Sequence, residues 1–170
     1  MQDKNPGLPA EEQVDIGRMV GIGALKYADL STDRIKDYVF DWDRMLAFEG
    51  NTAPYLQYAH ARIRSILRRA ADVEPIEGSP TALVPQERDL ILQLLQFDAA
   101  VHDTLDKYSP HRLATYLFDL AQAFTAFYEA CPVLKADPET RAFRITLSEQ
   151  TARVIAMGLG LLGIESPERM

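Results

Sequence analysis

Four residues of one predicted helix, residues 52–71, have side chains suited to holding a nucleic acid. Tyr55, Tyr58, Arg62 and Arg69 fall within about a 60° arc when the segment is drawn at about 100° per residue. Tyrosine rings stack on unpaired bases, each stack contributing on the order of 1–3 kcal/mol, and arginine binds phosphates and base edges. We call these four residues the aromatic–arginine strip.

The charge around the strip differs from that of the whole chain. The 170 residues carry a formal net charge of −7 and a pI near 4.9, which argues against a generally basic nucleic-acid binder. From Gly50 to Ala71 there is no acidic residue, but there are four arginines and His60. An ordinary amphipathic helix with half-buried tyrosines and solvated arginines would give the same pattern. Binding must therefore rest on a local patch.

Other chemistries lack the spacing they require. Phosphate-binding and dinucleotide loops need glycine patterns that these five glycines do not match: Gly21, Gly23, Gly158, Gly160 and Gly163. The three histidines (His60, His102, His111) and the single Cys131 show no zinc spacing. We expect no cofactor and no metal in this chain.

No self-contained active site is expected either. Cys131 has no histidine near it in sequence, so a buried structural thiol is the simpler interpretation. Asp41, Asp43 and Glu49 are close in sequence, but nothing sets them in a cleft, and solvated or paired roles suit them better. The predicted set of catalytic residues is empty.

The elements that would position the strip are helices. Glu11–Leu30 has the period of a helix, with Val14, Met19, Ile22 and Leu25 expected on its buried side. Its glycines, Gly17, Gly21 and Gly23, weaken the helix and suggest a surface that another backbone approaches closely.

The strip helix has clear signals of its own. Asp37–Phe48, before it, mixes β-forming residues with a helical ending and suits an extended piece leading into one helical turn. Thr52 is the expected N-cap, and Pro54 is tolerated in the first turn. The side expected to face the core comprises Leu56, Ala59, Ile63, Ile66, Leu67 and Ala70.

Periodic apolar residues continue to the end of the chain. Met1–Ala10 suits a linker and Asp72–Pro85 a proline-rich loop. Two helices are expected along Leu90, Leu94, Phe97, Val101 and Leu105, and along Leu113, Leu117, Leu120, Phe124 and Phe127. A last helix begins at Asp137 and stops at Gly163, with Leu147, Thr151, Val154, Gly158 and Leu161 in period. The prediction is an all-α bundle of about five helices.

The sequence also indicates where in the cell the protein is expected. A single cysteine allows no intramolecular disulfide, and no apolar run approaches the roughly 18 residues of a membrane span. We expect a soluble, cytoplasmic protein and, by default, a monomer.

Several stretches of the chain resemble arginyl-tRNA synthetases of the bacterial type. The longest is DYVFDWDRMLAFEGNTAPYLQYAHARIRSIL, from Asp37 to Leu67, similar to the family's signature where its catalytic half passes into the anticodon-binding (DALR-type) bundle. Similar stretches are VGIGALKYADLS from Val20, YLFDLAQAFTAFYEACPVL from Tyr116 and GLGLLGIESPERM from Gly158 to Met170. The resemblance covers essentially the whole chain.

This resemblance implies a module that binds the anticodon arm of tRNA for arginine. It places Tyr55, Tyr58 and Arg62 at the anticodon loop, and Tyr128 and Met170 near the anticodon bases. It also implies that the chain ends naturally at Met170.

The resemblance also implies what this chain leaves out. Full-length members carry His-x-Gly-His and Lys-Met-Ser-Lys-type signatures that bind ATP, with Mg²⁺, and drive arginine adenylation, and neither occurs here. We therefore expect this portion alone to be inactive. Residues 1–45 would be a connector from the catalytic half that couples anticodon binding to it, and residues 46–170 the bundle. A stand-alone helical adaptor that binds protein through Met19, Val20 and the adjacent glycines is the alternative.

Overall fold

The computed structural model describes residues 9–71 and 82–170, and within these ranges it contains helices and no strands. The helices are α1 (Ala10–Leu30), α2 (Trp42–Met45), α3 (Ala53–Arg69), α4 (Pro85–Leu95), α5 (Phe97–Lys107), α6 (Pro110–Ala130) and α7 (Pro138–Leu161). The all-α bundle predicted from the sequence is confirmed. None of these helices is both long and apolar enough to cross a membrane. The proline-rich loop and the linker predicted before α1 fall mainly outside the described residues.

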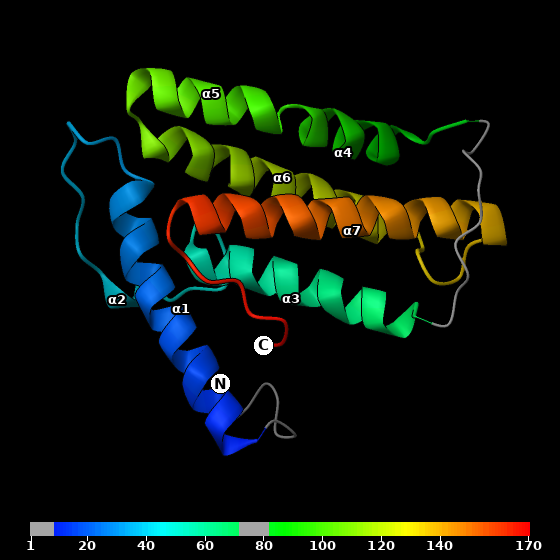
Figure 1. The fold of residues 1–170 in the computed structure, drawn as a ribbon, viewed down its shortest axis with the longest axis horizontal. Coiled ribbons are helices and arrows are strands. Elements are labelled where there is room, and N and C mark those ends of the chain that lie inside the picture. Colours follow the sequence, from blue (N-terminus) through cyan, green and yellow to red (C-terminus); the bar gives the residue numbers. More distant parts are fainter. Residues whose placement is uncertain (1–8, 72–81) are drawn as a thin grey trace.

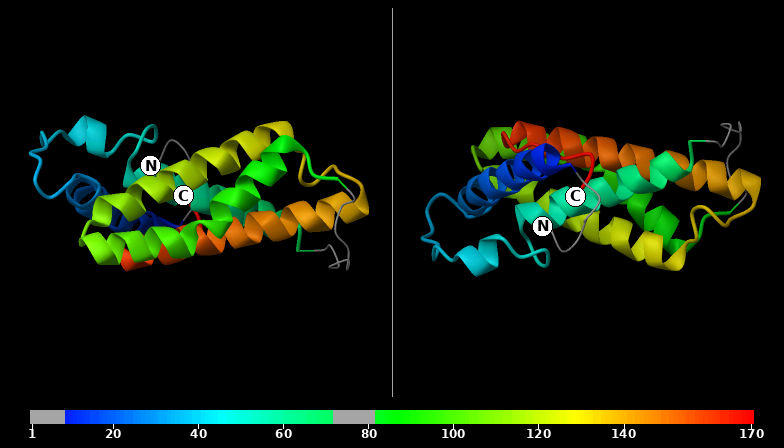
Figure 2. Two further views of the ribbon diagram at one scale, coloured as in Figure 1. Left: turned by 90° about the horizontal axis from the view of Figure 1, so that it is seen from above. Right: turned by 90° about the horizontal axis from the view of Figure 1, so that it is seen from below.

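Three long helices, α3, α6 and α7, run side by side and form the body of the bundle (Figure 1). α4 and α5 follow one another along α6, and α1 slants across the end of the bundle where α3 begins. Seen from above and below, α2 is set beside α1 at one end of the bundle (Figure 2). The shared core is lined by fully buried side chains: Leu56, Ile63, Leu90, Leu117, Leu120, Phe127, Ile155 and Leu159.

The helix ends follow the signals in the sequence. The Thr52 hydroxyl accepts a hydrogen bond from the Tyr55 amide at 3.3 Å, and the Asp137 carboxylate accepts one from the Thr140 amide at 3.1 Å. Past α7, Gly163 has φ of +69°, and the Ile164 amide reaches back to the Leu159 carbonyl at 2.9 Å. The predicted N-cap at Thr52, the predicted helix start at Asp137 and the predicted stop at Gly163 are confirmed.

The buried side predicted for α1 is wrong. Val14 is 72% exposed, and Ile22 and Leu25 are about two-fifths exposed. α1 instead turns Ile16, Val20, Gly23, Ala24 and Tyr27 toward the bundle. The approach is close at Gly23, where a Cβ would lie 2.9 Å from the Gln57 amide nitrogen. A helix with two apolar sides packs on the side that allows the closer approach, and apolar periodicity alone does not distinguish the two.

The single helix predicted along residues 90–105 is two helices. The helix is interrupted at Gln96, whose backbone amide donates to the Gln93 and Leu94 carbonyls. The break turns the second helix, so that Leu105 is 62% exposed although it continues the apolar spacing of the first. Apolar spacing carries across a short kink, which is why the sequence pattern did not reveal it.

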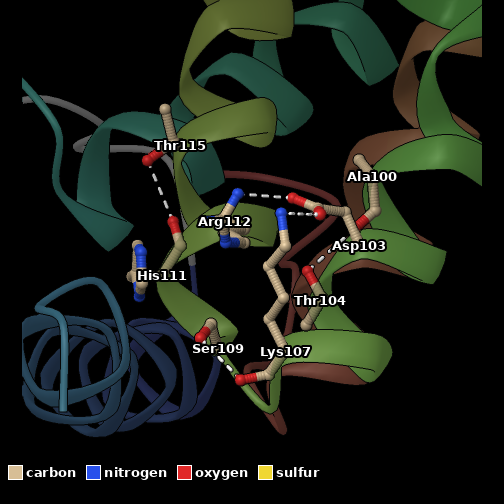
Figure 3. A network of polar contacts seen from close by, with 8 residues as sticks. All are labelled: Ala100, Asp103, Thr104, Lys107, Ser109, His111, Arg112 and Thr115. Atoms are coloured by element: carbon tan, nitrogen blue, oxygen red, sulfur yellow. Dashed lines mark hydrogen bonds and ion pairs between the residues drawn. The ribbon is translucent and has the colours of Figure 1, made fainter.

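A polar network fastens the joint between α5 and α6 (Figure 3). The Asp103 carboxylate accepts hydrogen bonds from the Lys107 ammonium and the Arg112 guanidinium, each at 2.6 Å. These two donors lower the pKa of Asp103, Lys107 contributing the larger effect. Between the helices Tyr108 has φ of +49°, the left-handed conformation that ends α5. The network holds a corner of the bundle.

Candidate nucleic-acid interface

α3 presents the two sides that its sequence predicts. Its core-facing residues are buried, with Leu67 only partly so. Along the strip, Tyr58 is 41% exposed, Arg62 and Arg69 are exposed, and Tyr55 is half-buried. The strip therefore lies at the edge of the core, with its polar tips open to solvent.

The two tyrosines are fixed by different aromatic neighbours. The Tyr55 ring packs against Phe118 of α6, with centroids 5.6 Å apart and planes tilted by 59°. The Tyr58 ring meets Phe48 edge to face, at 6.2 Å and 88°. Tyr55 is thus largely an anchor between α3 and α6. Tyr58 is held by its neighbour while part of its surface stays free to contact a ligand.

Arg62 is brought together with Tyr128, a residue distant in the sequence. The Arg62 guanidinium carbon lies 4.4 Å from the centroid of the Tyr128 ring on α6. Tyr128 in turn stacks against Phe124, at 6.1 Å and 23°. A guanidinium lying on a ring is held in a plane by the cation–π attraction and can donate hydrogen bonds from its edge. The family resemblance implies that both residues lie near the anticodon, and in the structure they are direct neighbours.

Arg69 lies on the same side of α3, in its last turn. It is seven residues beyond Arg62, about 10 Å along the helix axis. Its exposed guanidinium adds positive charge at the far end of the strip.

The chain end containing Met170 is fastened to another side of α3. The Gln57 side-chain amide donates to the Glu165 carbonyl at 2.7 Å, and His60 Nδ1 lies 3.0 Å from the Pro167 carbonyl. Further along, Arg64 pairs with the Glu168 carboxylate at 2.6 Å, and Arg68 donates to the Glu168 carbonyl at 3.0 Å. We call Gln57, His60, Arg64 and Arg68 the tail clamp.

The clamp holds Met170 half-buried against the bundle, and Figure 1 shows the chain end beside α3. The strip and the clamp occupy different arcs of the helical wheel, so α3 separates two sets of polar residues. Sequence reasoning missed the clamp, although its spacing of three, four and four residues is a helical-face signal. The clamp's partners at Glu165 and Pro167 are backbone carbonyls, which every residue carries, so the sequence does not identify them.

Burial changes the titration of His60. The side chain is 3% exposed, and this burial is the main cause that lowers its pKa, with the nearby Arg64 adding to it. The Pro167 carbonyl and Glu168 act in the opposite direction. A neutral imidazole that donates from Nδ1 to the Pro167 carbonyl fits this environment.

Other reactive groups play structural parts. Cys131 is buried in the core, which raises the pKa of its thiol, as expected for an unreactive cysteine. The Asp41 carboxylate caps α2 by accepting from the Arg44 amide at 3.2 Å. Within residues 9–71 and 82–170, no group of three His, Cys, Asp or Glu side chains is placed to hold a metal ion.

The chain is similar to known proteins over its whole length. Residues 56–170 match the DALR anticodon binding domain, and residues 1–42 match the catalytic domain of class I (R) tRNA synthetases. The arginine–tRNA ligase of Frankia casuarinae is 55% identical over 99% of this chain, and that of Thermobifida fusca is 56% identical over 97%. The chain spans only 29% of the length of each.

Solved structures agree with this match. The arginyl-tRNA synthetase of Thermus thermophilus superposes with a TM-score of 0.90 at 41% identity, covering 99% of this chain and 29% of that one. The arginyl-tRNA synthetase of Plasmodium falciparum gives 0.81 at 34% identity, over 92% of this chain and 28% of that one. Sequence and fold therefore agree that this chain belongs to the family of DALR anticodon binding domains.

Proposed function

We propose that this chain binds the anticodon arm of tRNA for arginine, as one part of an ATP-dependent arginine–tRNA ligase. The observation that carries the proposal is the Arg62 guanidinium lying on the Tyr128 ring at the α3–α6 edge, with the partly exposed Tyr58 one turn earlier on α3. It brings partly exposed rings and a fixed guanidinium to one edge, which is what unpaired bases on a phosphate chain require.

Charge at this edge favours RNA despite the acidic composition. Arg64 is paired with Glu168 and belongs to the tail clamp, whereas Arg62 rests on a neutral ring. Arg62 and Arg69 thus supply the positive charge for phosphates and base edges, while Tyr55 keeps α3 on α6. Because arginines would supply the phosphate contacts, we expect RNA affinity to fall steeply with salt.

The chain end is the third part of the proposed site. The tail clamp fixes residues 165–168, so Met170 is held close to α3. We propose that Met170 contacts an anticodon base with its thioether, as the sequence resemblance implies. An apolar, adaptable side chain suits the face of a base.

The remaining parts of the reaction belong to the proposed full-length enzyme. There, ATP and Mg²⁺ would be bound outside these 170 residues, and this portion alone would not activate arginine. We further propose that it acts as a monomer, in the cytoplasm where tRNA is charged. The division into a connector of residues 1–45 and a bundle of residues 46–170 remains a prediction.

The test is binding of an RNA hairpin with the sequence of the anticodon arm, followed by fluorescence anisotropy. Tyr58→Ala or Arg62→Ala is expected to weaken binding by about 1–3 kcal/mol, roughly 5- to 150-fold, with unchanged helical circular dichroism. Arg153→Ala is the matched control, because Arg153 is an exposed arginine on α7 in a 3.9 Å pair with Glu149. Equal affinity of parent, both strip variants and control would rule out this site.

A further inference from the structure

α1 carries a second apolar side that nothing in the described chain covers. Val14, Gly17, Gly21 and Leu25 follow one another at spacings of three, four and four residues, away from the buried side at Val20 and Ala24. Val14 is 72% exposed and Leu25 is 41% exposed. A Cβ added at Gly17 or Gly21 would meet no atom within 4 Å. We call these four residues the outer α1 face.

The segment after α1 is also unusually apolar on its surface. Ile35 is 83% exposed, Val39 is 79% exposed, and the exposed rings of Phe40 and Trp42 contact each other edge to face at 4.9 Å. Of the 18 large apolar side chains exposed in the described residues, eight lie between residues 9 and 42. That stretch is under a quarter of the described residues, so the exposed apolar side chains are concentrated there.

The exposed apolar side chains are concentrated on one side of the boundary between two family matches. Residues 1–42 match the class I catalytic domain, whereas the anticodon-binding match begins at residue 56. The chain corresponds to 29% of the length of its ligase relatives. Eight of the exposed apolar side chains therefore lie in residues that are related to a class I catalytic domain.

We propose that the outer α1 face, with the exposed side chains of residues 35–42, docks against the rest of a class I catalytic domain. This inference rests on the proposed function, because it assumes that the chain works within a full-length ligase. The open positions at Gly17 and Gly21 let a helix or loop of that domain approach the α1 backbone, between Val14 and Leu25. α1 would then be packed on both sides. Its buried side, which includes Val20 and Ala24, would contact the bundle, and the outer α1 face would contact the catalytic domain.

A stand-alone adaptor would instead bind protein through Met19, Val20 and the adjacent glycines. Val20 is 7% exposed and packed toward the bundle, and the adjacent Gly21 belongs to the outer α1 face. The outer α1 face is the apolar side of this helix that remains accessible.

The test compares the isolated chain with a full-length chimera, in which this chain replaces the matching region of the Thermobifida fusca ligase. Gly21→Cys is introduced in both, and labelling of this thiol by a maleimide is followed by peptide mass spectrometry. Cys131 is buried and gives little background. Gly160→Cys is the matched control, because Gly160 also lies in a helix, on α7, with no atom within 4 Å of an added Cβ.

We expect Gly21→Cys to label at least about 10-fold more slowly in the chimera than in the isolated chain, since a packed interface excludes the reagent. Gly160→Cys should label at similar rates in both. Equal labelling of Gly21→Cys in the two proteins would overturn the proposal. So would protection that appears in the isolated chain as its concentration rises, because a second copy would then cover the face.

A second variant tests the proposal if Gly21→Cys prevents either protein from folding. Leu25→Glu should leave the Tm of the isolated chain unchanged, because the side chain is partly exposed there, and should lower the Tm of the chimera by several degrees, because the charge would be buried. An unchanged Tm in both proteins contradicts the proposal. Binding of the hairpin RNA by the isolated chain separates the two proposals. The Leu25→Glu variant should still bind the hairpin. If the parent chain does not bind it, the RNA site is contradicted, but the docking surface is not.

Discussion

Arg62 and Arg64 flank Ile63 on α3, but their side chains have different environments. Arg62 lies on the Tyr128 ring, whereas Arg64 pairs with the Glu168 carboxylate at 2.6 Å. Both arginines are part of the same basic stretch, so the composition of that stretch does not distinguish their roles. Their side chains leave α3 about 200° apart, and the neighbouring elements therefore assign them to different roles. Arg62 is available to a ligand, and Arg64 holds the chain end.

His60 makes the tail clamp sensitive to acid. Its folded pKa is lowered by burial, so below a pH of about 6.5 the unfolded chain binds a proton that the folded chain resists. The free energy of unfolding should therefore decrease as the pH falls from about 7 toward 5. Urea denaturation across this range should show the decrease, and His60→Gln should make it shallower, because glutamine can donate to the Pro167 carbonyl without titrating. An equally steep decrease in His60→Gln would show that other groups cause it.

At the scale of elements, α6 and α7 depend on one glycine for their close packing. A Cβ on Gly158 would lie 2.5 Å from a methyl group of Leu117 and 3.1 Å from its Cγ, and Leu117 is fully buried. Gly158→Ala should therefore destabilise the fold by about 1–3 kcal/mol through overpacking. Thermal unfolding followed by circular dichroism measures the change.

Gly160→Ala is the control for helix propensity. No atom lies within 4 Å of a Cβ at this position, so alanine should stabilise the helix, by up to about 1 kcal/mol. If the two variants change the Tm equally, the packing explanation for Gly158 is wrong.

The elements show how far sequence reasoning reaches. The helices, the caps at Thr52 and Asp137 and the stop at Gly163 follow from local signals, because each depends on residues a few positions apart. The orientation of α1 does not, because both of its sides are apolar and the close approach to Gln57 depends on a distant helix. The break at Gln96 was also missed, since the apolar period continues across it.

The same distinction applies to the candidate site. The helical wheel separates Tyr55, Tyr58, Arg62 and Arg69 from the core, and the structure confirms that separation. The contact between Arg62 and Tyr128 joins residues 66 positions apart and has no local signal. Only the family resemblance linked Tyr128 to the strip before the fold was described.

For the whole molecule, an acidic chain can still present a local RNA site. The net charge of −7 is spread over the protein, while residues 50–71 contain no carboxylate of their own. The fold pairs Arg64 with Glu168 and leaves Arg62 and Arg69 at the α3–α6 edge. The other proposed surface, on α1, lies on a separate element and would connect this site to a catalytic domain.

Nuclease footprinting of the chain on full-length tRNA for arginine tests the central claim most directly. We expect protection that is confined to the anticodon arm and is lost when Tyr58→Ala and Arg62→Ala are combined. Protection of the acceptor stem, or no protection at concentrations where the chain is folded, would contradict it.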